Sequence, residues 1–269
     1  MHISRLEIIP AASFPSLNMK VVAPHPSISD CVQCIWLIRS KSDSPDIFRE
    51  KLYPDAGSSL TFSISSIGVS VGLFHNTKVI FQQWNMRNSY LSIRFKPGGA
   101  YRLLGLDVNE FTDNEIQIGN ELSKRFLQIT PLMDCLPSLN ENKQVHLVTN
   151  WLLQKRLKAK ASNEKMQALF AKALCQLIPP QILAEDHGIG RRTLERYTRN
   201  QFGVTPNQLH SFSQIKKARD KLVYTQNDLA TIALDCGYFD QSHFANSFRE
   251  STLETPLNYR IRKLSQISN

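Results

Sequence analysis

The chain has 269 residues, of which 42% are hydrophobic and 20% charged, and this length suits two modest domains better than a single core. Its net charge of +9 favours a polyanionic partner, although charge alone does not identify one. No apolar run approaches the roughly 20 residues that cross a bilayer, and Pro10 interrupts the short apolar stretch at the N-terminus. We therefore expect neither a membrane span nor a signal peptide.

The first 120 residues are predicted to form a β-rich domain. Residues 59–74 and 78–84 are rich in β-branched and aromatic residues and are broken by glycines and by a polar turn, which is typical of strands. Residues 88–105 predict a strand, a Pro-Gly-Gly turn and a short helix.

Residues 121–162 are predicted to be a helical extension and linker, because apolar residues such as Val145, Val148 and Leu152 recur at spacings of three and four. A basic run follows; it consists of Lys155, Arg156, Lys158 and Lys160. Such a run fits a solvated helix end and a DNA contact equally well.

Residues 163–269 are predicted to be helical throughout, with two short helix–turn–helix units on either side of a longer helix at 205–223. Gly188 and Gly237 stand at matching turn positions, where glycine best tolerates a left-handed backbone. Asn227 is the predicted cap that starts the second unit. The long helix would measure roughly 28 Å at about 1.5 Å per residue. Since the major groove recurs on one face of DNA every ~34 Å, two helices held this far apart could enter adjacent groove segments.

The two units differ in charge. Residues 187–221 carry eight basic and two acidic side chains, whereas residues 228–254 carry one basic and five acidic. The first unit is therefore expected to dominate phosphate contact and the salt dependence of DNA binding.

Two small groups of residues suggest other chemistry. Asp240 and His243 share one helical face close to Cys236, but a metal site needs one or two further ligands. We instead expect Asp240 to cap the helix that it begins and His243 to face a base or a phosphate.

The other group is the C-x-x-C of Cys31 and Cys34, which has no second cysteine pair to complete a zinc site. A bulky apolar stretch follows it, so buried structural thiols are expected. The five cysteines are Cys31, Cys34, Cys135, Cys175 and Cys236. An odd and scattered set favours reduced thiols in the cytoplasm over a disulfide framework.

The stretches "GIGRRTLERYTRNQFGVTPNQL" and "IALDCGYFDQSHFANSFREST", followed by "TPLNYR", resemble the AraC/XylS-type DNA-binding domain of bacterial transcription regulators. The resemblance spans about residues 163–262. It implies recognition helices at 191–202 and 240–250, with base or phosphate contacts from Arg191, Arg192, Glu195, Arg196, Arg199, Gln241, Ser242, His243, Asn246 and Arg249.

These residue types suit the task, since arginine reads guanine, Gln or Asn reads adenine, and Glu accepts a hydrogen bond from cytosine. Three positions depart from the family pattern. Asn246 stands where arginine is common, Leu253 where glycine is frequent, and Gly190 in place of a Ser/Thr-type cap. The departures at 246 and 253 bear on how strongly the second unit binds.

The N-terminal part is similar to one sensor-domain type of that family through "LYPDAGSSLTFSI" and "IRFKPGGAYRLLGL", which implies a cupin-like fold. The loops at 54–58 and 96–101 could line a ligand pocket or be ordinary turns. Helices near Trp151 often dimerise in the resembled family, so that face is either core or a dimer seam. No effector-binding residue can be named.

Together these features predict an α+β protein that binds double-stranded promoter DNA and regulates transcription, with activation the commoner mode in the resembled family. RNA polymerase, a small-molecule effector and a second copy of the chain are its expected partners. No catalytic residue, cofactor or metal is expected. One alternative is a DNA-binding module joined to an alkyl-transfer repair enzyme, and another is a regulator whose N-terminal domain binds only a protein.

Overall fold

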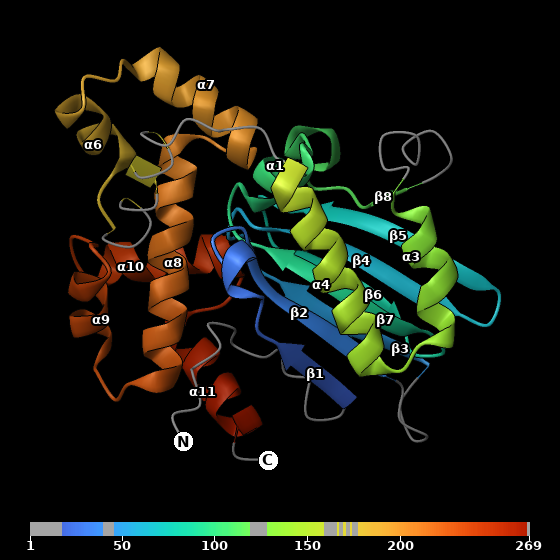
Figure 1. The fold of residues 1–269 in the computed structure, drawn as a ribbon. Coiled ribbons are helices and arrows are strands. Elements are labelled where there is room, and N and C mark those ends of the chain that lie inside the picture. Colours follow the sequence, from blue (N-terminus) through green and yellow to red (C-terminus); the bar gives the residue numbers. More distant parts are fainter. Residues whose placement is uncertain are drawn as a thin grey trace. The chain divides into compact units, whose positions relative to one another are not determined.

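The computed structural model describes residues 18–39, 46–118, 128–158, 166, 169–170, 173 and 177–267. Figure 1 shows a β-rich part and a helical part, as the α+β prediction requires. The chain divides into two compact units. Unit 1 consists of Met1–Glu50, Gly57–His75 and Phe81–Lys160, and unit 2 of Lys51–Ala56, Asn76–Ile80 and Ala161–Asn269. Residues 119–127 and 159–165 lie outside the described residues, and with them parts of the predicted extension and linker at 121–162.

Unit 1 is built on a six-stranded sheet in the order β1-β2-β7-β4-β5-β8, whose paired neighbours run antiparallel. The strands are β1 (Asn18–Val22), β2 (Val32–Arg39), β4 (Ser58–Ser65), β5 (Gly68–His75), β7 (Ser89–Phe95) and β8 (Ile116–Gln117). A separate two-stranded sheet pairs β3 (Ile47–Leu52) with β6 (Ile80–Asn85).

Helices cover one face of the large sheet. They are the short α1 (Gly99–Leu104), α3 (Thr130–Cys135) and α4 (Glu141–Lys158), with 3-10 turns at Pro26–Ile28, Val108–Phe111 and Leu136–Ser138. Alternate residues of β4 and β7, such as Leu60 and Ile93, face these helices and are buried, as the pleat of a strand requires.

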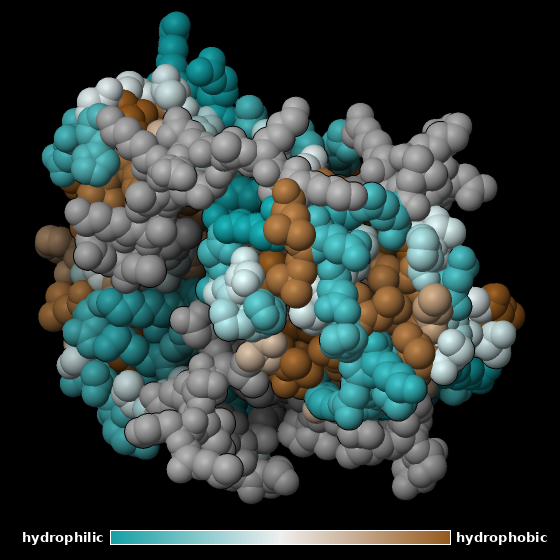
Figure 2. Space-filling model, viewed as in Figure 1, coloured by the Kyte–Doolittle hydropathy of each residue, from teal (hydrophilic) through white to brown (hydrophobic). Residues whose placement is uncertain are grey.

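The burial of α4 shows whether its apolar face is part of the core or is free to form a dimer interface. Val148, Trp151 and Leu152 are buried in the core of unit 1, so this face is core. Figure 2 shows hydrophobic residues gathered between α3 and α4, while the outer side of α4 is largely hydrophilic.

The opposite face of the large sheet carries a small aromatic cluster. The ring of Trp84 from β6 lies edge-on to Trp36 at 5.5 Å and to Tyr90 at 4.9 Å between centroids. Its indole N–H donates to the buried carboxylate of Glu50 at 3.1 Å. The two-stranded sheet thus contributes the carboxylate of Glu50 and the ring of Trp84 to the aromatic cluster on this face.

The helices of unit 2 whose bounds lie within the described residues are α6 (Pro180–Asp186), α7 (Arg191–Phe202), α8 (Pro206–Tyr224), α9 (Leu229–Asp235), α10 (Gln241–Thr252) and α11 (Pro256–Ile267). The pairs α6–α7 and α9–α10 form two helix-turn-helix units, and all the other helices contact α8. The joining helix therefore lies where the sequence predicts it.

Local chemistry explains these boundaries. Thr205 and Gln208 form a reciprocal capping box at the start of α8. Gly188 and Gly237 have φ of 65° and 78°, which glycine adopts without steric cost. The cap of α9 is Asp228 and not Asn227, because the Asp228 carboxylate accepts the amide of Thr231 at 2.7 Å.

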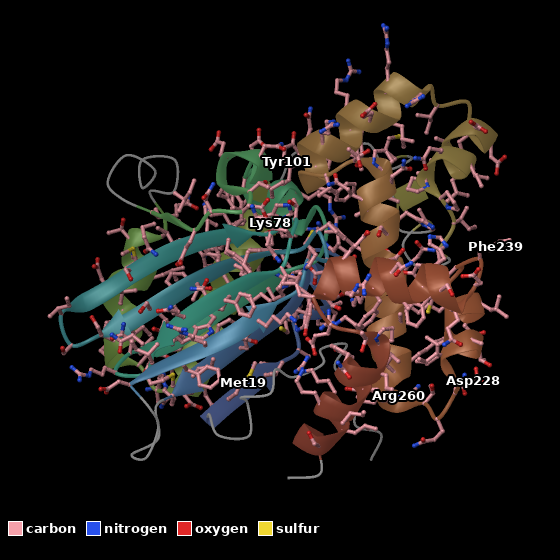
Figure 3. All side chains as sticks on the ribbon, turned by 180° about the vertical axis from the view of Figure 1, so that it is seen from behind. Met19, Lys78, Tyr101, Asp228, Phe239 and Arg260 are labelled. Carbon is pink, nitrogen blue, oxygen red and sulfur yellow. The ribbon has the colours of Figure 1, made fainter. Side chains whose placement is uncertain are left out.

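Arginine side chains tie α11 to the rest of unit 2. Arg260 donates to the carbonyl oxygens of Leu222 at 3.0 Å and of Asn227 at 2.7 Å. These bonds join α11 to the end of α8 and to the segment that precedes α9. Asp228 and Arg260 are both marked in Figure 3.

Candidate DNA interface

Helix α7 is anchored by one buried face. Leu194, Thr198 and Phe202 point into the core of the first helix-turn-helix unit, and Tyr197 stacks on Phe170 with 5.3 Å between ring centroids. The opposite face carries exposed guanidinium groups, those of Arg191, Arg192, Arg196 and Arg199. Figure 3 shows nitrogen-bearing side chains extending from this helix.

Glu195 is the acidic member of the predicted contact set on α7. It is partly buried, and its carboxylate accepts from Arg199 at 3.3 Å, one turn further along the helix. Glu195 thus engages Arg199, whereas Arg191, Arg192 and Arg196 have no recorded acidic partner among the described residues.

Helix α10 repeats the burial pattern of α7 position by position. Phe244, Phe248 and Thr252 are buried, and the rings of Phe244 and Phe248 lie 5.6 Å apart. The exposed face carries the remaining predicted contact residues: Gln241, Ser242, His243, Asn246 and Arg249. The predicted contact residues therefore lie on the exposed side of α7 and α10, except for the partly buried Glu195.

Asp240 stands at the N-cap of α10, where its carboxylate accepts the amide of His243 at 2.7 Å. The ring of His243 lies edge-on to Tyr238 at 5.4 Å between centroids. Cys236 ends α9 with a fully buried thiol, and burial raises its pKa to about 11. Among the described residues no group of three or more His, Cys, Asp or Glu is placed to hold a metal ion.

The acidic residues of the second unit are mostly occupied by local partners. Asp228 and Asp240 cap helices, and backbone bonding to Thr231 lowers the pKa of Asp228. Asp235 pairs with Lys221 at 2.6 Å, and Glu254 with Arg262 at 2.8 Å. Glu250 is exposed on α10. Lys221 and Arg262 therefore offset the charge of two of the five acids, whereas the capping carboxylates and Glu250 remain uncompensated by an ion pair that the structure records.

Sequence reasoning missed a residue that shapes the second turn. Gln214 on α8 donates its side-chain N–H to the carbonyl oxygens of Cys236 at 3.0 Å and of Gly237 at 3.2 Å. It fixes the turn between α9 and α10 from a different helix. A glutamine within a helix gives no sequence signal for such a role, because the contact crosses 22 residues.

The described cysteines differ in exposure. Cys31 and Cys34 are buried, as predicted, and burial raises the pKa values of their thiols to about 11 and about 12. Cys135 is exposed, and Cys175 lies outside the described residues. In the described part of the chain, no helix combines the length and apolar character that crossing a bilayer requires.

Two domain families match the chain. Residues 183–262 match a helix-turn-helix domain family, and residues 20–117 match a domain of unknown function, DUF6597. The first match covers α7 to α10 completely, together with the end of α6 and the start of α11.

Similar curated proteins include the HTH-type transcriptional activator RhaS of Mannheimia succiniciproducens, 35% identical over 79 residues, which are 29% of this chain and 30% of that protein. RhaS of Yersinia pestis (strain Pestoides F) is 32% identical over 78 residues, 29% of each chain. The match thus spans about 30% of the length of these relatives.

Similar solved structures include ToxT of Vibrio cholerae, with 10% identity, 92% of this chain and 98% of that chain covered, and a TM-score of 0.42. The DNA-binding domain of AdpA in complex with a target DNA has 22% identity, 39% and 96% coverage, and a TM-score of 0.37. The helix-turn-helix family match runs from within α6 to within α11. Residues 183–262 therefore match a helix-turn-helix domain family, and their similarity to transcriptional activators supports the predicted resemblance to AraC/XylS-type regulators.

Proposed function

We propose that this protein regulates transcription by binding double-stranded promoter DNA through α7 and α10. The observation that carries the proposal is the shared pattern of the two helices, each with a buried apolar face and an exposed polar face. The joining helix α8 has 19 residues, about 28 Å at 1.5 Å per residue. This length approaches the ~34 Å between successive major-groove segments on one face of DNA.

The two helices would divide the work of recognition. Arg192, Glu195 and Arg196 would reach base edges from α7, while Arg191 and Arg199 would contact phosphates. Gln241, Ser242, His243, Asn246 and Arg249 would contact DNA from α10. The exposed arginines of α7 would supply most of the dependence on salt, because each neutralised phosphate releases counterions.

The remaining parts of the proposal concern the whole protein. We propose that residues 1–120 form the sensing or dimerising domain, residues 121–162 the extension and linker, and residues 163–269 the DNA-binding domain. The named relatives are transcriptional activators, which supports activation through contact with RNA polymerase. Control by a small-molecule effector or by a second copy of the chain completes the scheme.

The alternative of an alkyl-transfer repair enzyme needs a reactive cysteine. Cys31, Cys34 and Cys236 are buried with raised pKa values, and a thiol that stays protonated is a poor nucleophile. Metal analysis of the purified protein tests this alternative, since such an enzyme usually carries a four-cysteine zinc cluster.

Selection of double-stranded DNA from a random pool tests the main proposal. The full chain should enrich one sequence with two half-sites about one helical turn apart. Binding of the enriched duplex should weaken steeply as salt rises. Recovery of unenriched DNA after repeated rounds would refute sequence-specific binding.

A further inference from the structure

A short strap from far upstream forms part of unit 2. The strap is Lys51–Ala56, which comprises the last two residues of β3 and the segment that leads to β4. It belongs to unit 2, although the chain on both sides of it belongs to unit 1. Its last residue, Ala56, is 2% exposed and packs in the core of the first helix-turn-helix unit. The strap is therefore a component of the DNA-binding unit.

Tyr53 is the centre of the strap's polar contacts. Its hydroxyl donates to Glu254 Oε1 at 2.8 Å and accepts from Arg262 Nη2 at 2.9 Å. Lys51 Nζ lies 2.8 Å from the same Glu254 oxygen. Burial opposes ionisation of Glu254, yet hydrogen bonds from Arg262, Lys51 and Tyr53 lower its pKa to about 2. Glu254 is thus a charged carboxylate held by two elements, α11 and the strap.

The ring of Tyr53 also makes contacts within unit 2. The guanidinium of Arg219 on α8 lies 4.1 Å from the ring centroid, close enough for a cation–π contact. Tyr259 of α11 lies edge-on to Tyr53 at 5.9 Å and is fully buried. Arg219 also donates to the Tyr259 hydroxyl at 3.1 Å. One tyrosine of the strap therefore joins α8, α11 and the turn that contains Glu254.

That turn ends the second recognition helix under strain. Leu253, the C-cap of α10, has a left-handed backbone with φ of 58°, which costs free energy for a residue with a Cβ. The matching C-cap of α7 is Gly203, with φ of 68°, where no such cost arises. A strained conformation persists only where its surroundings fix it, and Glu254 follows Leu253 directly.

We propose that Tyr53 and Lys51 are positioning residues for DNA recognition: by holding Glu254 they fix the strained turn and so the orientation of α10. This inference rests on the proposed function, because it assumes that α10 contacts DNA. It gives strap residues, which are not among the predicted DNA contacts, an effect on how the second half-site is read.

A mutant cycle on the full chain separates positioning from general stability. The probe is the duplex that the wild-type chain enriches from a random pool, and affinity is measured for Tyr53→Ala, Leu253→Gly and the double variant. Tyr53→Ala should weaken binding of the duplex about tenfold, because it removes several weak contacts that fix the orientation of α10. Glycine at 253 holds the left-handed turn without help, so Tyr53→Ala should cost far less in the Leu253→Gly background.

Matched controls and a milder variant complete the test. Tyr101→Ala and Lys20→Met alter a tyrosine and a lysine of unit 1 and should leave affinity unchanged. If Tyr53→Ala does not fold, Tyr53→Phe and Lys51→Met take its place, and each should weaken binding about threefold, the equivalent of one weak hydrogen bond. Base preference should relax only in the half-site that Asn246→Ala affects.

The outcomes distinguish the two proposals. If the wild-type chain enriches a duplex and the strap variants bind it like the wild type, the positioning role is wrong while DNA recognition stands. Equal losses in both backgrounds would also overturn positioning, because they show that the strap does not act through the turn. If the wild-type chain enriches nothing, the proposed function fails and this inference fails with it.

Discussion

Helices α7 and α10 hold matching positions in their units, yet they begin and end with different chemistry. Gly190 starts α7 without a side-chain hydrogen bond, whereas Asp240 starts α10 with a carboxylate cap. At the C-terminal end α7 has the more favourable residue, since its left-handed C-cap is Gly203, whereas that of α10 is Leu253. Helix α7 therefore lacks a stabilising side-chain cap at its N-terminus, and the C-terminus of α10 depends on contacts from other elements.

The largest expected effect comes from the core that supports α10. Phe248 is fully buried between Phe244 and Tyr259, so Phe248→Ala should lower the free energy of unfolding by about 3–5 kcal/mol through lost burial and a cavity. Denaturant unfolding of the full chain measures this. Phe239→Ala is the control, because Phe239 is 86% exposed and projects from the turn before α10 (Figure 3). Equal effects of the two changes would show that α10 is not anchored as described.

Acid should weaken the contacts at the end of α10. The folded pKa of Glu254 is about 2 against an ordinary value of 4.5, so its stabilisation is complete above about pH 4.5 and is lost as pH falls toward 2. Its size is on the order of 2–3 kcal/mol. Unfolding of Glu254→Gln should show less dependence on pH across this window than the wild type. Glu250→Gln, at an exposed position, should keep the wild-type dependence.

Base contacts from the two helices should differ in strength. Arg196→Ala should cost about 1–3 kcal/mol on the selected duplex and relax base preference at one position. Asn246→Ala should cost less, since a neutral amide forms weaker hydrogen bonds than a guanidinium. Quantitative footprinting of both variants measures the comparison. A larger loss for Asn246→Ala would make the second unit the main reader.

The smallest effects concern the starts of the helices. Asp240→Ala should destabilise by about 1 kcal/mol, because α10 loses the side-chain bond that caps it. Gly190→Ser should stabilise by a few tenths of a kcal/mol, since it supplies α7 with the cap it lacks. Thermal unfolding of the two variants measures whether each change lowers or raises the stability. A loss of stability in Gly190→Ser would mean that the extended backbone at 190 needs glycine for another reason.

Local signals were enough to predict much of the helical unit. The turn at Gly188 and the apolar residues Leu194 and Tyr197 predicted the helix that became α7, and the bounds 191–202 that the resemblance implies agree with the structure. The spacing of Phe244 and Phe248 indicated the buried face of α10, and Gly237 the turn before it. The cap of α9 was predicted one residue too early, at Asn227, because Asn and Asp both favour that position.

Contacts between distant residues gave no local signal. The sequence left residues 54–58 open between a ligand loop and an ordinary turn. In the structure Ala56 has φ of 58° and is buried with residues of unit 2. Periodicity reports which face of an element is buried, but it does not report which other element buries that face. Likewise, the separate pairing of β3 with β6 depends on register, which the strand pattern alone does not fix.

The strap also sets a condition on the order of folding. Lys51 and Glu254 are separated by 203 residues, so ribosomes adding about 5–20 residues per second complete the strap roughly 10–40 s before the turn that receives it. Closing so long a loop costs only modestly more entropy than closing a shorter one, because that cost grows with the logarithm of loop length. The delay in synthesis is the larger effect: unit 2 becomes complete only after the turn that contains Glu254 has been made.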